Sequence, residues 1–196
     1  MNLIKMDIKY SACITILFFS CTTEPKNCGN GYLNLDGKCY NEGDIYILKS
    51  IIDSSYNTIS MKWDKNYNGI IEPLELNFQK WNDSGRLTTL WLYDDTLSGN
   101  LPINIGDLEF LDTLNLSYNQ LTGTIPNSIG ELNNLNYLYL YHNELSGNIP
   151  ESLCNINLDD IKFQIWGNKL CPPYPSCISK MKIGIQDTSE CFKEIN

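Results

Sequence analysis

The feature that most constrains this chain is an internal repeat of 24 residues. Three segments align without gaps and begin at Leu87, Leu111 and Leu135. A fourth, more degenerate unit begins at Ile161 and stays in register after an insertion of one residue. A unit of this length buries its apolar side only by stacking on its neighbours, so the sequence predicts a solenoid and not a layered globule.

Each unit opens with leucines that alternate with other residues. This period of two predicts a short strand with one buried face, and it occurs at Leu90 and Leu92, Leu114 and Leu116, and Leu138 and Leu140. An amide follows each of the later strands, at Asn119, Asn143 and Asn168, whereas Asp95 takes that place in the first unit. A buried amide at this point can satisfy backbone groups that the turn leaves unpaired.

The second half of each unit carries turn residues. Gly99, Gly123 and Gly147 permit a tight turn, and a Leu-Pro or Ile-Pro pair follows each of them. The whole pattern, L-x-x-L-x-L-x-x-N-x-L-x-G-x-I-P, runs from about residue 86 to residue 178. It resembles the plant-type leucine-rich repeat of plant receptor kinases, polygalacturonase-inhibiting proteins and many bacterial surface proteins.

The resemblance implies an α/β leucine-rich-repeat fold, a right-handed solenoid of about four repeats. A short parallel β-sheet would line its concave face, and 3₁₀ or irregular turns its convex side. The repeats would span residues 87–178, between an N-terminal cap at 44–86 and a C-terminal cap at 179–196, because end repeats otherwise expose core leucines.

Helical spacing and turn residues describe the N-terminal cap. Ile45, Leu48, Ile51 and Ile52 predict an amphipathic helix over residues 44–52, with Asp44 as its N-cap. Residues 78–81, the turn 82–85 and residues 86–87 predict a hairpin that leads into the first repeat.

The N-terminus reads as an export signal over residues 1–20. Lys5 and Lys9 precede an apolar run that ends at Phe19, and this run is too short to span a bilayer. Residues 17–21 resemble a bacterial lipobox, which implies lipidation of Cys21 and a membrane anchor; plain secretion is the alternative. We expect an exported protein, either secreted or attached to the cell surface or outer membrane as a lipoprotein. Residues 21–43 would then form a tether and a disulfide loop.

Six cysteines remain once Cys13 and Cys21 are set aside, and an even set in an exported chain predicts disulfides. The spacing favours Cys28–Cys39 as a local loop. For the other four we favour Cys154–Cys177 and Cys171–Cys191, although other pairings are open. A zinc site is the competing interpretation, but the chain has no C-x-x-C pair and a single His.

Strand residues that point away from the core would line the concave face. Equivalent positions of successive repeats stack one strand spacing apart, so they form columns rich in aromatic rings. The predicted ligand-binding residues are Trp91, Tyr93, Asp94, Asn115, Tyr118, Tyr137, Tyr139, Tyr141, His142, Gln164 and Trp166. Exposed aromatic residues dominate binding hot spots, but they also stabilise solvent-facing sheets, and both interpretations stay open.

Residues 64–75 match the calcium loop of an EF-hand, D-x-[DN]-x-[DN]-G-x5-E. The ligands would be Asp64, Asn66, Asn68, the carbonyl of Ile70, Glu72 through water, and Glu75. The alternative is a polar turn that binds nothing. A bound calcium ion would be structural, and no cofactor is required.

The composition argues against several functions. The net charge of −9 disfavours nucleic acid, and a single His leaves little scope for a nucleophilic triad. The sequence therefore predicts a non-enzymatic surface module that binds a protein or a polysaccharide through its concave face. A structural or adhesion protein with a calcium-ordered cap is the alternative, and an enzyme is a distant third.

Overall fold

A computed structural model of the chain describes residues 27–55, 58–59, 61–156 and 162–191. The predicted signal segment 1–20, Cys21, and the start of the predicted tether lie outside these residues. None of the helices in the described ranges is long and apolar enough to cross a membrane.

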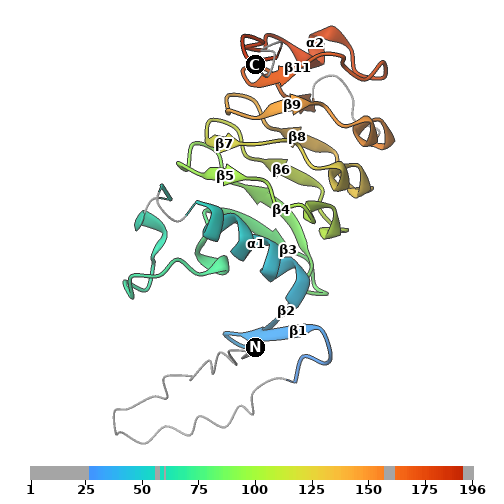
Figure 1. Ribbon diagram of the computed structural model, residues 1–196. Coiled ribbons are helices and arrows are strands. Elements are labelled where there is room, and N and C mark those ends of the chain that lie inside the picture. Colours follow the sequence, from blue (N-terminus) through green and yellow to red (C-terminus); the bar gives the residue numbers. More distant parts are fainter. Residues whose placement is uncertain (1–26, 56–57, 60, 157–161, 192–196) are drawn as a thin grey trace, which may run out of the picture.

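The repeats form a stack of short parallel strands (Figure 1). They are β4 (Leu87–Trp91), β6 (Thr113–Asn115), β8 (Tyr137–Tyr139) and β10 (Phe163–Gln164). Leu90 pairs with Leu114, and Leu114 with Leu138, so the pairing register equals the 24-residue repeat. An antiparallel strand, β3 (Phe78–Trp81), adds to β4 as the predicted hairpin and completes a five-stranded sheet of order β10-β8-β6-β4-β3.

The chain continues around each turn through a second set of strands and a 3₁₀ segment. The second strands are β5 (Ser98–Asn100), β7 (Gln120–Thr122), β9 (Ser146–Asn148) and β11 (Lys169–Cys171), paired as β5 with β7 and β9 with β11. The 3₁₀ segments η3 (Ile105–Asp107), η4 (Asn127–Glu131) and η5 (Glu151–Asn155) begin close after the Leu-Pro or Ile-Pro pairs. Gly99, Gly123 and Gly147 all have φ near +72°, which the tight turn requires.

The repeat leucines fill one continuous interior. Leu90, Leu92, Leu114, Leu116, Leu138 and Leu140 are each 0% exposed. Ile105 and Ile129, from the 3₁₀ side, are equally buried and close the interior opposite the sheet. Apolar burial of this kind is the main term that stabilises a repeat stack.

A column of amides connects successive turns, as the sequence predicted. Asn143 donates through Nδ2 to the carbonyls of Leu116 (2.9 Å) and Leu140 (3.1 Å), and its Oδ1 accepts from the amide of Leu121 (3.0 Å). Asn119 and Asn168 repeat this arrangement one turn before and one turn after. Each amide therefore satisfies backbone groups of two neighbouring repeats.

Gln186 extends the same column beyond the last repeat. Its Nε2 donates to the carbonyl of Ile165, and its Oε1 accepts from the amide of Leu170. The sequence analysis did not single out Gln186, because this residue lies outside the 24-residue register. At the other end Asp95 is 1% exposed. It accepts a hydrogen bond from the Asn77 side chain and forms an ion pair with Lys62. Burial raises the pKa of Asp95, while Asn77 and Lys62 oppose that rise.

The N-terminal segment begins with a hairpin of β1 (Tyr32–Leu35) and β2 (Lys38–Asn41), within the region predicted as a disulfide loop. Helix α1 (Glu42–Ser54) follows and packs beside the first turn of the stack (Figure 1). The prediction of Asp44 as N-cap is wrong, because the side chain of Asn41 accepts from the amide of Asp44. Asp44 is instead buried and forms an ion pair with Arg86. Its carboxylate also accepts from the amide of Leu87 and so connects helix α1 to the first repeat.

Two further 3₁₀ segments, η1 (Met61–Trp63) and η2 (Pro73–Glu75), flank the predicted calcium loop. The C-terminal part contains the short helix α2 (Lys180–Ile183). The described residues contain three disulfides, Cys28–Cys39, Cys154–Cys177 and Cys171–Cys191, which are the favoured pairs. The last two connect the final turns of the stack to the segment that follows them.

The amide column predicts a large penalty for its loss. Asn143→Ala removes three hydrogen bonds and leaves buried backbone groups unpaired, so we expect the free energy of unfolding to fall by about 3 kcal/mol. Denaturant titration measures this value. Asn127→Ala, at an exposed position of η4, is the matched control and should change it by less than about 0.5 kcal/mol. Equal losses for the two variants would contradict the assigned role.

Candidate functional site: the aromatic face

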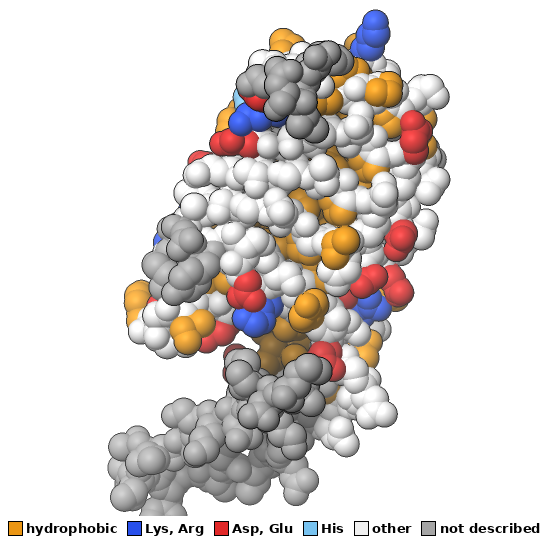
Figure 2. Space-filling model, viewed as in Figure 1, with side chains coloured by type: hydrophobic (Ala, Val, Ile, Leu, Met, Phe, Trp, Pro, Cys, Tyr) orange, Lys and Arg blue, Asp and Glu red, His pale blue; other side chains and the backbone are white. Residues whose placement is uncertain are grey.

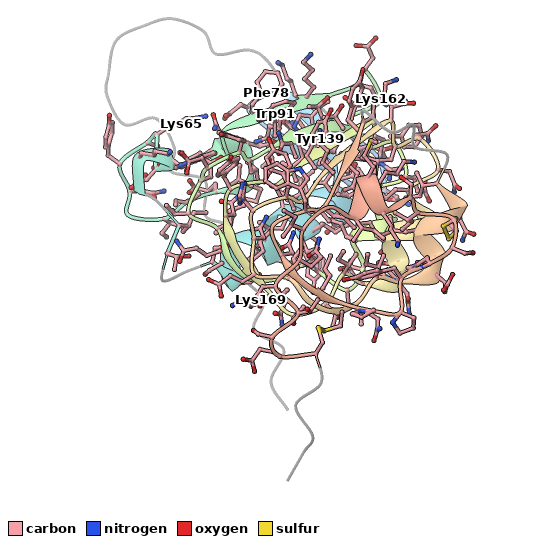
Figure 3. All side chains as sticks on the ribbon, turned by 90° about the horizontal axis from the view of Figure 1, so that it is seen from above. Lys65, Phe78, Trp91, Tyr139, Lys162 and Lys169 are labelled. Carbon is pink, nitrogen blue, oxygen red and sulfur yellow. A yellow bond between two sulfur atoms is a disulfide. The ribbon has the colours of Figure 1, made fainter. Side chains whose placement is uncertain are left out.

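The outward surface of the five-stranded sheet carries most of the predicted site. Register places Trp91 beside Asn115, Asn115 beside Tyr139, and Tyr139 beside Gln164, as the column analysis predicted. Figure 3 shows Trp91 and Tyr139 on one side of the solenoid, with Lys169 on the opposite side. We call this surface, from β4 to β10 with the residue that follows each strand, the aromatic face.

The rings of the aromatic face form a connected set. Tyr141 and Trp166 stack with centroids 5.0 Å apart and planes within 14°. His142 lies 4.4 Å from Trp166 and 4.4 Å from Tyr118. Tyr118 in turn lies 5.2 Å from Tyr93. The set therefore crosses all four repeats, and several of its members stay exposed: Trp91 and Tyr93 are each 40% exposed, Tyr118 42% and Tyr137 36%.

One predicted face residue is not exposed. Asn115 lies in its expected column but is only 2% exposed, because the larger side chains of Trp91 and Tyr139 flank it and their rings approach to 6.3 Å. Its Oδ1 accepts from both the amide and the hydroxyl of Ser117, which is itself fully buried. Because a backbone N–H needs an oxygen acceptor, this contact fixes the orientation of the Asn115 amide.

The residues that follow the strands adopt an unusual backbone conformation. Asp94, Tyr118 and His142 have φ of 53°, 57° and 52°, and Gly167 occupies the same offset with φ of 69°. A non-glycine residue in this region costs roughly 1–2 kcal/mol. Tyr118 and His142 each contact three other rings, and an aromatic pair contributes about 0.5–1.5 kcal/mol, so these contacts offset the backbone cost.

A groove of about 430 Å³ lies within the aromatic face. Its lining consists of Trp91, Tyr93, Asn115, Tyr139, Tyr141 and Gln164, all of which were predicted site residues. Burial raises the pKa of Tyr93, and its neighbours Tyr118, Tyr141 and Asp94 raise it further. The phenol therefore stays protonated near neutral pH and can donate a hydrogen bond.

Three residues at the margins of this face were not predicted from the sequence. Phe78 pairs with Trp91 and continues its row onto β3, where it is 46% exposed; Figure 3 shows Phe78 close to Trp91. Lys80 lies over the Phe78 ring, and at the other end Lys162 lies over the Tyr137 ring. The predicted hairpin was the available signal, because an antiparallel partner of β4 must extend the same surface.

Two other cavities are weaker candidates for a binding site. One of about 310 Å³ lies beside the Cys154–Cys177 disulfide, and one of about 370 Å³ lies at the turn between β3 and β4. Neither has a connected set of exposed rings. Lys and Arg side chains are few on the face drawn in Figure 2 and lie apart from one another, so that face offers no basic patch.

The predicted calcium loop brings its oxygens together. The amide of Asn68 donates to Asp64 Oδ1 and to Asn66 Oδ1, both at 3.0 Å, so these two oxygens lie close to one another. Glu75 returns to the start of the loop and accepts from the amides of Lys65 and Asn66. Asn68 Oδ1 accepts from the amide of Ile70, and Glu72 accepts from the side chains of Asn66 and Asn68.

The two glutamates of the loop interact. Burial raises the pKa of Glu72, and the hydrogen bond and charge of Glu75 raise it further. Burial also acts to raise the pKa of Glu75, but hydrogen bonds from Glu72, Asn66 and Lys65 outweigh it and lower the pKa. Within the described residues no group of three His, Cys, Asp or Glu side chains is close enough to hold a metal ion, so amide and backbone oxygens would have to complete any site.

Comparison with known proteins supports the repeat assignment. A family model described as Leucine Rich Repeat matches residues 110–132 and 134–156. A search of curated proteins found no match. These two matched segments lie within the predicted repeat region.

Solved structures give the fold. PEPR1 in complex with AtPEP1 aligns with a TM-score of 0.57 at 24% identity, over 69% of this chain and 19% of that chain. The BIR2 ectodomain from Arabidopsis thaliana aligns with a TM-score of 0.51 at 22% identity, over 74% and 92% of the two chains. The GASSHO1/SCHENGEN3 receptor kinase ectodomain from the same plant, in complex with CASPARIAN STRIP INTEGRITY FACTOR 2, aligns with a TM-score of 0.50 at 24% identity, over 72% and 21%.

This chain thus spans about a fifth of the PEPR1 chain. At such low sequence identity, the structural similarity shows the fold alone. The fold is a leucine-rich-repeat solenoid with parallel strands.

Proposed function

We propose that this chain is an exported, non-enzymatic binding module that docks a protein partner on its aromatic face. The observation that carries the proposal is the connected set of rings, several of which are exposed. Aromatic side chains bury a large area at a low entropic cost, which makes them the usual anchors of an interface.

The comparisons add support of a general kind. PEPR1 and GASSHO1/SCHENGEN3 are similar in fold, and their structures contain AtPEP1 and CASPARIAN STRIP INTEGRITY FACTOR 2 respectively. Three disulfides agree with export to an oxidising compartment. About four repeats between an N-terminal and a C-terminal cap would present a modest surface. A polysaccharide remains the second class of partner, because sugar rings also stack on aromatic side chains.

Substitution of the central rings tests the proposal. We expect the triple variant Trp91→Ala, Tyr139→Ala, Tyr141→Ala to lose partner capture at least tenfold, since a buried aromatic anchor contributes about 2 kcal/mol or more. The measurement is capture by the immobilised full chain from native cell-surface extracts, followed by mass spectrometry and glycan analysis.

Tyr46→Ala supplies the matched control, because Tyr46 is 62% exposed on α1, outside the aromatic face. Capture should be unchanged in this variant. Partner capture that survives the triple substitution in a folded chain would refute the proposed function.

Membrane attachment through Cys21 is part of the proposal and rests on the lipobox-like residues 17–21. Lipidation would hold the module at the cell surface or outer membrane. Mass spectrometry of the mature N-terminus should show an acylated Cys21 as the first residue. An unmodified N-terminus would leave plain secretion as the route.

The runner-up is a structural or adhesion protein whose N-terminal cap is ordered by calcium. Asp64 and Asn66 accept from one backbone amide, and Glu75 returns from the other end of the loop to accept from the amides of Lys65 and Asn66; this gathering of oxygens favours a cation at this loop. A cation would also offset the charge of Glu75, which together with burial raises the pKa of Glu72. Asn68, Glu72 and the carbonyl of Ile70 would complete the site.

Calcium addition should stabilise the chain if the loop binds it. With a Kd of about 10⁻³ M, typical of extracellular modules, ~10 mM calcium would add roughly 1.4 kcal/mol to the free energy of unfolding. Thermal melting in calcium, in magnesium and in chelator measures the effect, and Glu75→Gln should abolish it. Identical melting in calcium and in chelator would reject the site.

A further inference from the structure

We propose that the segment bound in the groove of the aromatic face is an uncharged polyproline II stretch of a partner protein, lying across the strands. This inference rests on the proposed function and deepens it by naming the conformation and chemistry of the ligand. Three features of the groove carry it: an amide donor that opens onto the groove, the spacing of rings and amides, and the absence of charge among the lining residues.

The first feature is the amide nitrogen of Asn115. Its Oδ1 is held by Ser117, whereas Nδ2 has no hydrogen-bond partner among the described residues. Asn115 as a whole is only 2% exposed, yet it lines the groove. Asn115 Nδ2 is not among the fully enclosed side-chain atoms that lack a partner, so it keeps access to the groove, where a ligand acceptor can reach it. The ligand should therefore present an acceptor at this point.

The second feature is the order of side chains along one row. From β3 to β10 the row reads Phe78, Trp91, Asn115, Tyr139 and Gln164. From Trp91 onward, rings and amides alternate, so each kind recurs every second strand. Two strand spacings amount to about 9.5 Å.

A polyproline II helix has three residues per turn and a rise of about 3.1 Å per residue, so it repeats every ~9.3 Å. Carbonyls of residues i and i+3 would therefore meet Asn115 and Gln164, while the intervening residues pack against Trp91 and Tyr139. A fully extended strand would not return the same side to the groove at this interval, because its side chains alternate every residue. The match between the two repeats thus favours the polyproline II form.

The third feature is the polarity of the lining. None of the six groove residues is charged, which complements an uncharged ligand segment. Proline-rich segments in this conformation have no internal hydrogen bonds, and proline has no N–H, so they present acceptors. The groove lining contains matching hydrogen-bond donors: Asn115 Nδ2, the Trp91 indole N–H and the Tyr93 phenol. A sugar would bring hydroxyl donors as well, while Asn115 Oδ1 is already occupied by Ser117.

Fluorescence anisotropy with defined probes tests the inference on the full, disulfide-bonded chain. The main probe is a labelled dodecapeptide of four Leu-Pro-Pro repeats. A peptide of equal composition with its leucines in one block, a Gly-Ser dodecapeptide and a β-linked glucose hexamer are the comparison probes. We expect the repeating peptide to bind at least about tenfold more tightly than each of the other three.

Variants locate the contact. Asn115→Asp keeps the acceptor for Ser117 but replaces the free donor by a charged oxygen, so binding of the repeating peptide should weaken about tenfold or more. Gln164→Glu makes the same change at the half-buried second amide and serves if Asn115→Asp fails to fold. Gln120→Glu carries the same charge change on the exposed part of β7, outside the aromatic face, and should alter binding less than about twofold.

Several outcomes would overturn the inference. They are equal binding of the repeating and the block peptides, no advantage over Gly-Ser, unchanged binding in both amide variants, or tighter binding of the glucose hexamer. Each of these leaves the proposed function standing if the triple alanine variant still loses its native partner. Failure of the proposed function would instead appear as unchanged capture of the native partner by the triple alanine variant.

Discussion

The hydrogen bonds of the buried amide column hold the repeats in one register, and the rest of the structure depends on them. Asn119, Asn143 and Asn168 each bond backbone groups of two adjacent turns, and Gln186 continues the column at the C-terminal end. Apolar burial alone would tolerate small shifts between neighbouring turns, since it has no direction. The amides do not tolerate such shifts, because their geometry fixes which carbonyl faces which nitrogen.

Fixed register turns a repeated sequence into an ordered surface. Because Leu90, Leu114 and Leu138 pair directly, the outward residues between them must line up as well. Trp91, Asn115, Tyr139 and Gln164 then become neighbours although 73 positions separate the first from the last. The packing of the interior thus determines which side chains meet on the aromatic face, and the distance between strands sets their spacing. Both the proposed binding role and the polyproline II ligand depend on that spacing.

Much of this arrangement could be predicted from the sequence, because a 24-residue repeat supplies its own alignment. The strands, the amides at Asn119, Asn143 and Asn168, the turn glycines and the columns of rings all follow from it. Features outside the repeat were harder to predict from the sequence. The N-cap at Asn41 and the amide of Gln186 depend on local geometry at the ends of the stack. The burial of Asn115 depends on the sizes of Trp91 and Tyr139 beside it, which a list of outward positions does not weigh.

The central claim is that repeat register gathers the aromatic rings into one face, and nuclear Overhauser spectroscopy of the full chain tests it most directly. The account predicts contacts between the rings of Trp91 and Tyr139 and between those of Tyr141 and Trp166, together with slowly exchanging side-chain amide protons at Asn143 and Asn168. Absence of both ring contacts, with rapid exchange at these amides, would contradict it.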